Sequence, residues 1–540
     1  MTAVVLSATA TATSASADAG PTPAEAAVDE FIRAEMAASS IPGAAVAITR
    51  GNEVLLVRGY GHDSRGAPVT GGTLFRVASL SKSFTSLAVL QLADAGRLSL
   101  DDRVVEHLPE LRLADPRGAG ITVRQLLDQT SGLADQTSSD LDRTQPTSTT
   151  EAVASMSSAH LVAAPGTRWN YHNPNYHLAA RLVEMASGEE FEHYLHHHVF
   201  QPAGMDATST TIMSTDPVAD LAPGHVVAYG KPIAAEGLTT FEAGAGGVVS
   251  TAADMADWLI VHANDGRAAD GARLVSESGM TEMHTGRAPA GYALGWDTDG
   301  PVDTPTRVQH SGNLLTYSAF QAVLPDSGYG VALLFNSGSA FLLEQSAIFE
   351  GVLDVVEGAD VTTRGPRFPT TTRDAALASS TVVVVLLGTR GILTSRRWAA
   401  RHGPAGARAM LRMVPLLGVV GLLAAFPYLA SVLYGGRDVT WLAAAYAWPA
   451  LVVFVAASLV ASAATVMVRV SQLSWHRAPG PGAGAGERRT MEPGEVTPRD
   501  RARLEGSVAE VERQPAGEDL ALLGDDTTGS SWSRRAEECA

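Results

Sequence analysis

Phe-Arg-Val-Ala-Ser-Leu-Ser-Lys occupies positions 75–82 of a chain of 540 residues. The text that follows is mostly apolar, and we expect a helix from about Ser79 to Ala95 with Gly96 as its C-cap. Lys82 follows Ser79 by three residues, and side chains at this spacing lie on one face of a helix. A serine hydroxyl is a weak nucleophile until a base takes its proton, and a lysine shielded from water can be that base. Ser-x-x-Lys is nevertheless common by chance, and a solvated helix face is the alternative interpretation.

Strand patterns lie at both ends of the segment that contains this motif. Gly43–Ala47 and Glu53–Arg58 are predicted to be two strands joined by a turn. Ser318–Leu324 and Gly330–Phe335 are apolar runs separated by Pro-Asp-Ser-Gly, which predicts a hairpin. The sequence between these two ends has mostly the apolar spacing of helices. We therefore expect an α+β domain, with a sheet assembled from its two ends and helices packed around it.

Two further motifs carry side chains suited to nucleophilic catalysis. Residues 171–173 read Tyr-His-Asn; a buried tyrosine near a lysine can pass a proton to a leaving group, and an amide can hold a substrate carbonyl. Residues 310–312 read His-Ser-Gly at the end of a predicted strand. A strand edge beside a nucleophile can bind an extended acyl chain and supply a second oxyanion donor. Taken singly, each motif is more often an ordinary loop or strand end.

The order and spacing of the three motifs resemble those of penicillin-binding proteins and serine β-lactamases. The chain is most similar to the class C β-lactamase branch, which includes DD-carboxypeptidases, D-aminopeptidases and carboxylesterases. Flanking segments at 41–44 (Ile-Pro-Gly-Ala), 126–133 and 246–254 also resemble segments of that family. The resemblance covers residues 26–357. It implies a β-lactamase/DD-peptidase-like fold, in which an antiparallel sheet is flanked by helices and accompanied by a helical subdomain.

The resemblance also implies a mechanism. Ser79 would attack an amide or ester carbonyl, and Lys82 and Tyr171 would handle its proton and that of the leaving group. The backbone N–H groups of Ser79 and Asn313 would form the oxyanion hole, and water would then release the acyl group. The implied substrate-binding residues are Asn173, His310, Ser311, Gly312 and Asn313. No metal and no organic cofactor are implied, and the substrate would be a D-amino-acid peptide, a β-lactam or an ester.

Three departures from the family pattern bear on the substrate. His310 stands where most β-lactamases have lysine, which resembles some DD-peptidases and esterases and weakens the case for β-lactam hydrolysis. Gln129 stands where the family often has histidine, and we interpret this as a structural difference. Residues 313–317 are bulkier than the glycine-rich turn of many relatives, which would narrow the site or change the acyl preference.

Composition argues against several other classes of protein. The chain has 57 Asp and Glu against 39 Lys and Arg, a formal net charge of -18, which makes it a poor candidate for nucleic-acid binding. Cys539 is the single cysteine, so neither an internal disulfide nor a cysteine-based metal site can form. His193 and the His-His-His run at 196–198 are interpreted as a solvated helix, because no neighbouring pattern supplies the general base of a zinc hydrolase.

The two ends of the chain predict export and membrane anchoring. Residues 1–19 are rich in Ala, Thr and Ser and form a possible signal peptide, although its usual basic region is missing. After a linker at 358–374, the apolar runs at 411–434 and 441–468 are predicted transmembrane helices, and 375–393 is a weaker third candidate. Residues 471–540 are rich in Gly, Pro, Glu and Arg and predict a disordered tail.

The distribution of arginine predicts the orientation of these helices. Arginine occupies positions 396, 397, 401 and 408 between the first and second runs and position 412 at the leading edge of the second, whereas the short segment between the second and third runs has only Arg437. The positive-inside rule then places the first loop and the tail in the cytoplasm, and the N-terminal domain outside the cell.

Three functions remain open on the sequence alone. The first is an exported, membrane-anchored serine hydrolase acting on D-amino-acid peptides of the cell wall or on related amides and esters. The second is a β-lactamase of the same fold. The third is a penicillin-binding sensor in which Ser79 is acylated and released slowly.

Overall fold

The computed structural model describes residues 23–475, apart from residues 138, 140, 142–143, 340, 360–369, 403–409 and 435. The possible signal peptide at 1–19 lies outside the described residues, as do most of the linker expected at 358–374 and the expected tail beyond residue 475. Residues 23–359 are built around a sheet, and the described residues of 370–475 form helices and their connections.

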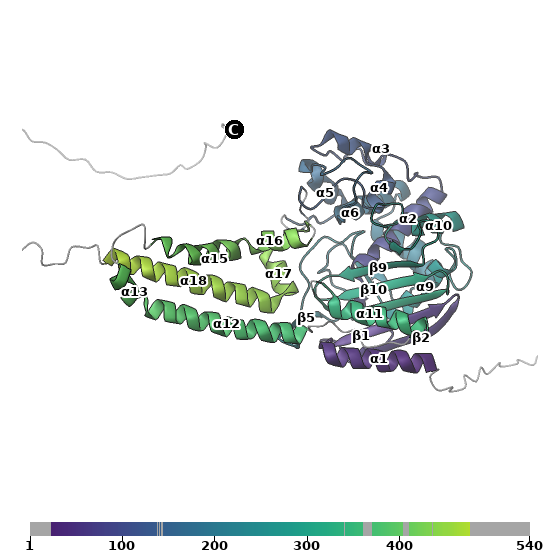
Figure 1. Cartoon of the computed structure of the whole chain (residues 1–540). Coiled ribbons are helices and arrows are strands. Elements are labelled where there is room, and N and C mark those ends of the chain that lie inside the picture. The colour runs from purple at the N-terminus through teal and green to yellow at the C-terminus, as the bar shows by residue number, and fades with distance from the viewer. Residues whose placement is uncertain are drawn as a thin grey trace, which may run out of the picture. The chain divides into compact units, whose positions relative to one another are not determined.

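A six-stranded antiparallel sheet organises the first of these parts (Figure 1). In spatial order its strands are β2 (Glu53–Gly61), β1 (Gly43–Arg50), β11 (Tyr329–Phe335), β10 (Ser318–Leu324), β9 (Arg307–Asn313) and β8 (Asp297–Asp299). β1 pairs with β11 from Ala44↔Phe335 to Arg50↔Tyr329, so strands from the two ends of the domain are neighbours. The expected α+β fold, with a sheet assembled from both ends, is therefore confirmed.

Helices cover both faces of the sheet, because successive side chains of a strand point to opposite faces. Val46 of β1 packs into one core with Ile32 and Val352, which come from the helices on the first face. Ala45 belongs to a second core that contains Leu259 from the helix on the other face. These helices are α1 (Pro23–Ser39) and α11 (Leu343–Val356) on the first face, and α9 (Ala252–Ala263) on the second.

The rest of this domain is mostly helical and packs around α2 (Ser81–Asp94), in which every residue from 81 to 90 is buried. The other helices are α3 (Val104–His107), α4 (Val123–Leu127), α5 (Thr149–Ser155), α6 (Pro174–Ser187), α7 (Phe191–Leu195), α8 (Gln201–Ala203) and α10 (Glu277–His284), with short turns η2 (Pro116–Gly120), η3 (Met156–Ser158) and η4 (His196–Phe200). Two small sheets complete it: β3 (Phe75–Arg76), β7 (Val248–Ser250) and β4 (Ser209–Thr210); and β12 (Ser337–Gly338), β5 (Gly224–Ala228) and β6 (Lys231–Ala235).

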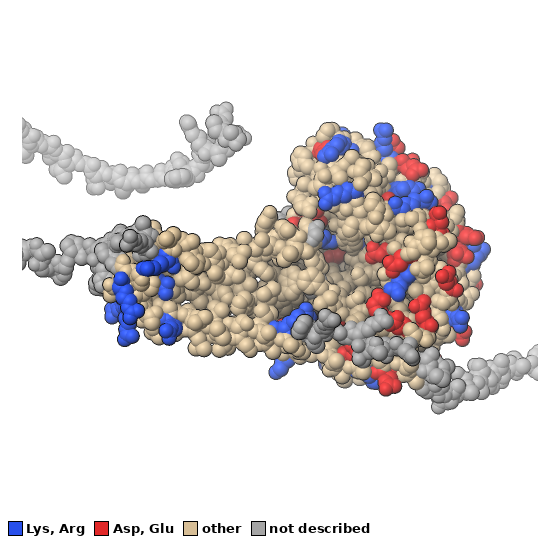
Figure 2. Space-filling view, in the orientation of Figure 1, with Lys and Arg blue, Asp and Glu red and all other residues tan. Residues whose placement is uncertain are grey.

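The C-terminal part contains α12 (Thr370–Leu393), α13 (Ser395–His402), α15 (Val414–Ala424), α16 (Phe426–Leu433), α17 (Trp441–Ala447) and α18 (Pro449–Trp475). Two stretches among the described residues, α12 and 449–473, are long and apolar enough to cross a membrane, and α15 with α16 would make a third as one bent span. Figure 2 shows few charged residues along this part except near α13, which contributes Arg396, Arg397 and Arg401.

Proline interrupts two of the apolar runs that were expected to be continuous helices. The run at 411–434 is bent by 57° between α15 and α16. Pro427 lies in the first turn of α16, where its ring would clash with the carbonyl of a preceding helical turn. The run at 441–468 breaks at Trp448 (φ -140°), because the residue before Pro449 is disfavoured in the helical region.

Candidate active site

Ser79 lies in a tight turn rather than in the helix that the sequence predicted. The turn η1 (Ala78–Leu80) joins β3 to α2, which begins at Ser81, and Ala78 has a left-handed φ of 52°. The Ser81 hydroxyl holds this turn, because it donates to the Ala78 carbonyl at 2.6 Å and accepts from the Val248 amide at 3.0 Å. Ser79 itself is half-buried and lines a cavity of about 950 Å³.

Lys82 is fully buried at the start of α2, and its side-chain nitrogen lies close to the Ser79 hydroxyl. Lys82 Nζ lies 3.3 Å from Ser79 Oγ, 3.0 Å from Asn173 Oδ1 and 2.8 Å from the Ala245 carbonyl oxygen. It also lies 4.8 Å from the centre of the Tyr171 ring, at cation–π distance. The structure thus places this side chain within reach of the serine proton.

Tyr171 completes the immediate surroundings of the serine. Its hydroxyl donates a hydrogen bond of 2.8 Å to Ser79 Oγ. Burial raises the pKa of Tyr171 well above its usual value, which outweighs the opposing effect of the hydrogen bond to Ser79. Tyr171 is therefore a neutral phenol at any ordinary pH, and it can donate or relay a proton.

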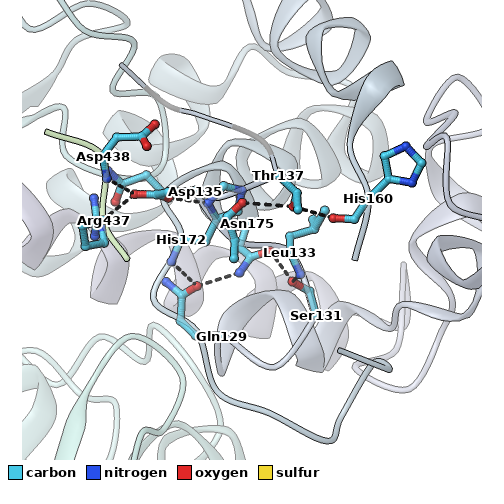
Figure 3. A network of polar contacts seen from close by, with 12 residues as sticks. Gln129, Ser131, Leu133, Asp135, Thr137, His160, His172, Asn175, Arg437 and Asp438 are labelled. Carbon is cyan, nitrogen blue, oxygen red and sulfur yellow. Dashed lines mark hydrogen bonds and ion pairs between the residues drawn. The ribbon is translucent and has the colours of Figure 1, made fainter. Parts of the chain in front are cut away.

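Buried polar contacts hold the segment that carries Tyr171 and Asn173 (Figure 3). The Gln129 side-chain oxygen accepts from the His172 amide at 3.1 Å and from Asn175 Nδ2 at 2.6 Å. On the other side, His172 Nδ1 lies 2.7 Å from Asp135 Oδ1. Gln129 thus has the structural role that the sequence suggested, since it holds the backbone amide of His172 and the side chain of Asn175 on either side of Asn173.

His310 lies on β9, and each of its ring nitrogens makes a hydrogen bond. His310 Nδ1 lies 2.7 Å from the Ser311 carbonyl oxygen, which can only accept, so this nitrogen carries the hydrogen. His310 Nε2 then accepts from the Tyr292 hydroxyl at 3.0 Å. Burial, with a smaller contribution from the Lys82 charge, lowers the pKa of His310 to about 3. The histidine is accordingly neutral, and this position carries no fixed positive charge.

The residues after His310 form one wall beside Ser79. Ser311 and Asn313 line the cavity, and the Asn313 side chain holds the following turn by donating to the Ser339 carbonyl at 2.7 Å and accepting from the Leu315 amide at 2.8 Å. Gly312 packs directly against the turn η1, where a Cβ would lie 3.0 Å from the Ser79 amide nitrogen. The absence of a side chain at Gly312 therefore allows β9 to approach Ser79.

The histidines at 193 and 196–198, which were assigned to a solvated helix from the sequence, differ from the buried side chains around Ser79. His198 Nε2 lies 2.9 Å from Glu189 Oε1, and His193 lies 3.7 Å from Glu190, with all four side chains well exposed. Within the described ranges, no group of three or more His, Cys, Asp or Glu side chains is arranged to hold a metal ion.

Sequence reasoning missed several residues that shape the site. No sequence motif marked Tyr292, because it lies outside the three motifs and contacts His310 only once the chain is folded. Ala245 acts through its carbonyl oxygen, which no residue type encodes, although it directly precedes the Gly-Gly segment at 246–254. Arg437 was noted only as a charge between two apolar runs, yet its Nε lies 2.8 Å from Asp135 Oδ2.

Comparison with known proteins adds independent information. A family model described as Beta-lactamase matches residues 28–347. "Protein flp" of Staphylococcus aureus (strain MW2) is 27% identical over 322 residues, a match covering 58% of this chain and 64% of that protein. The chain thus spans somewhat less than two thirds of the length of that relative. "Penicillin-binding protein 4" of Amycolatopsis lactamdurans is 30% identical over 333 residues, covering 56% of this chain and 82% of that protein.

Solved structures share the fold. The octameric penicillin-binding protein homologue from Pyrococcus abyssi aligns with a TM-score of 0.54 at 25% identity, covering 66% of this chain and 81% of that one. EstCE1, described as a hydrolase with promiscuous acyltransferase activity, aligns with a TM-score of 0.53 at 20% identity, covering 62% of this chain and 98% of that one. At that identity the second likeness concerns the fold alone.

Proposed function

The chain belongs to the Beta-lactamase family, and on that premise we propose that it is a serine hydrolase that works through an acyl-enzyme on Ser79. The observation that carries this proposal is the position of Ser79 Oγ, which lies 3.3 Å from Lys82 Nζ and 2.8 Å from Tyr171 Oη. A hydroxyl between an amine and a phenol has both a proton acceptor and a proton donor at hand, which is what acyl transfer to serine needs.

The proposed reaction has two stages. Ser79 Oγ attacks the substrate carbonyl carbon while Lys82 takes the serine proton, and the backbone N–H groups of Ser79 and Asn313 stabilise the oxyanion. The bond to the leaving group then breaks, and Tyr171 relays a proton to the departing nitrogen or oxygen. In the second stage, water attacks the acyl carbon, and the acyl group leaves Ser79 as a carboxylic acid. Asn173 orients the acyl side of the substrate.

Because His310 is neutral, we favour hydrolysis of an amide or ester over efficient hydrolysis of β-lactams. A cationic residue at this position would attract the carboxylate of a β-lactam, but a histidine with a pKa of about 3 supplies no such charge. We therefore favour a DD-peptidase-like or esterase-like hydrolase of the cell envelope.

The proposed location is the cell membrane, with the hydrolase domain outside and the tail in the cytoplasm. Two helices of sufficient length and hydropathy and the arginines of α13 support it. Protease treatment of intact cells should digest the hydrolase domain, and protection of that domain would contradict this orientation.

A panel of substrates tests the activity. A D-Ala-D-Ala peptide, a nitrocefin-type β-lactam and short p-nitrophenyl esters should be assayed with the wild type and with Ser79→Ala. We expect ester or peptide hydrolysis to exceed β-lactam turnover, and every activity to disappear in Ser79→Ala. Hydrolysis that persists in Ser79→Ala would show that the nucleophile is wrong.

A further inference from the structure

The connection between α16 and α17 forms part of the active-site cavity, although it is more than 350 residues away from Ser79 in sequence. The cavity that contains Ser79 and Tyr171 is lined on one side by residues from this connection and from the helices beside it. We call these residues the helical wall: Tyr434, Arg437, Asp438, Val439, Ala443, Ala447 and Trp448.

The helical wall is fixed to the hydrolase domain by an ion pair between half-buried Arg437 and buried Asp135 (Figure 3). Arg437 Nε lies 2.8 Å from Asp135 Oδ2, and the Asp438 amide donates to the same oxygen at 3.3 Å. The Asp135 side chain is only 2% exposed, and its other oxygen lies 2.7 Å from His172 Nδ1. A carboxylate buried to this degree requires its partners, so the contact is specific to this arrangement.

The same contact brings a charge close to the catalytic tyrosine. The Arg437 guanidinium carbon lies 5.1 Å from the centre of the Tyr171 ring. Lys82 Nζ lies 4.8 Å from the centre of the same ring. Gly436 makes the close approach possible, because it has a left-handed φ of 85° and a Cβ there would overlap the Gln136 side chain. The backbone of the connection is thus shaped to meet the hydrolase domain at the site.

Beyond Arg437 and Asp438, the helical wall is apolar and aromatic. Phe341 of the hydrolase domain, which is 54% exposed, lies 5.8 Å from the Tyr434 ring and 5.7 Å from the Trp448 ring. Trp448 directly precedes α18, one of the helices that are apolar enough to cross a membrane. Aromatic residues at the ends of such helices are typical of the boundary between lipid and water. The apolar side of the cavity therefore lies at the level where an amphiphile would present its polar head.

We propose that the substrate is an amphiphilic ester or amide that resides in the membrane and places its apolar chain along the helical wall while its carbonyl reaches Ser79. This inference rests on the proposed hydrolase function and narrows its substrate class. Ser79 Oγ bonds to the carbonyl carbon, and the bond to the alcohol or amine breaks as that group leaves with a proton. Water then releases the carboxylic acid. The wall has no role in bond breaking; it positions the chain.

The proposed arrangement should make the rate depend on the length of the substrate's apolar chain. Each buried methylene strengthens binding by about fourfold. An ester with a ten-carbon acyl chain should accordingly exceed the acetate in kcat/KM by at least about 100-fold, if most of the chain lies against the wall.

The test uses the full chain in phosphatidylcholine nanodiscs, with p-nitrophenyl acetate and p-nitrophenyl decanoate as probes. Trp448→Ala should lower the ratio of kcat/KM for decanoate over acetate by about tenfold or more, because it removes apolar surface from the wall. Trp441→Ala is the matched control: Trp441 lies in α17 and contacts Phe426, as Trp448 does, but it is not among the residues that line the cavity. Its ratio should equal that of the wild type.

The outcomes separate the two proposals. Hydrolysis that survives in Ser79→Ala refutes the hydrolase mechanism itself. Hydrolysis that depends on Ser79 but shows no preference for decanoate, or a ratio that changes equally in Trp448→Ala and Trp441→Ala, overturns the amphiphile inference and leaves the hydrolase standing. Thermal unfolding of each variant verifies that a changed ratio does not reflect a misfolded chain.

Discussion

Replacing Gly312 by alanine should disable the nucleophile by adding a single methyl group. The new Cβ would lie 2.5 Å from the Val77 carbonyl oxygen, 3.0 Å from Ala78 Cβ and 3.0 Å from the Ser79 amide nitrogen. Carbon and oxygen atoms pack no closer than about 3.3 Å. β9 and the turn η1 must therefore separate by about 1 Å, and no flexible side chain is present to absorb the displacement.

The expected loss follows from the displacement of the proposed oxyanion donors. A misplacement of about 1 Å at a reacting centre costs about 100-fold in rate, since the donors must lie within about 2.7–3.1 Å of the oxyanion. Overpacking of this kind also destabilises a folded chain by about 1–3 kcal/mol. We expect Gly312→Ala to fold, with a lowered unfolding temperature and an acylation rate reduced by about 100-fold.

Single-turnover acylation with an activated ester measures this effect separately from substrate release. Gly328→Ala is the control, because it lies in the hairpin between β10 and β11 with a left-handed φ of 70° and its nearest neighbouring atom is 3.9 Å away. That variant should lose about 1 kcal/mol through backbone strain and retain its acylation rate. If Gly312→Ala acylates as fast as Gly328→Ala, then β9 does not set the geometry of the nucleophile.

Three further results are expected. Lys82→Met, which keeps the length of the side chain without its amine, should lower kcat/KM by about 100- to 10,000-fold for every substrate, with no fall in unfolding temperature. Because the folded pKa of His310 (about 3) lies below the unfolded value of about 6.5, its contribution to stability is complete above pH 6.5 and is lost as the pH falls toward 3. Urea unfolding of the wild type should therefore lose about 2 kcal/mol more than His310→Asn between pH 7 and pH 5. Arg437→Met and Asp135→Asn should each reduce kcat/KM, and the double variant should differ from additivity by about 0.5–3 kcal/mol in a double-mutant cycle.

The sequence predicted the sheet because strands depend on local patterns, and its three motifs contain residues that the structure brings together. The apolar runs located β10 and β11 to within one residue, whereas β1 and β2 each continue three residues beyond their predicted ends. The motif residues Ser79, Lys82 and Tyr171 lie together in the structure. The exact start of α2 was not predictable, because the turn before it depends on the distant Val248 amide. The contact between Arg437 and Asp135 spans 302 residues, and no local pattern encodes a partner so far away.

The hydrogen-bond directions around Ser79 narrow the choice of base. Tyr171 is neutral and donates to Ser79 Oγ, so in this arrangement it gives a hydrogen rather than takes one. His310 gives its hydrogen to the Ser311 carbonyl and receives one from Tyr292. Neither group is therefore placed to accept the serine proton when the substrate arrives.

Lys82 is placed to do so. Two of its contacts, Asn173 Oδ1 at 3.0 Å and the Ala245 carbonyl oxygen at 2.8 Å, are oxygens that only accept. As an ammonium, Lys82 donates to both of these oxygens and to Ser79 Oγ at 3.3 Å. Once the amine has lost a proton it keeps two hydrogens for the two oxygens, and its lone pair can face Ser79 Oγ. The carbonyl of Ala245 and the amide of Asn173 thus orient the base, and this orientation favours direct proton transfer from Ser79 to Lys82 during acylation.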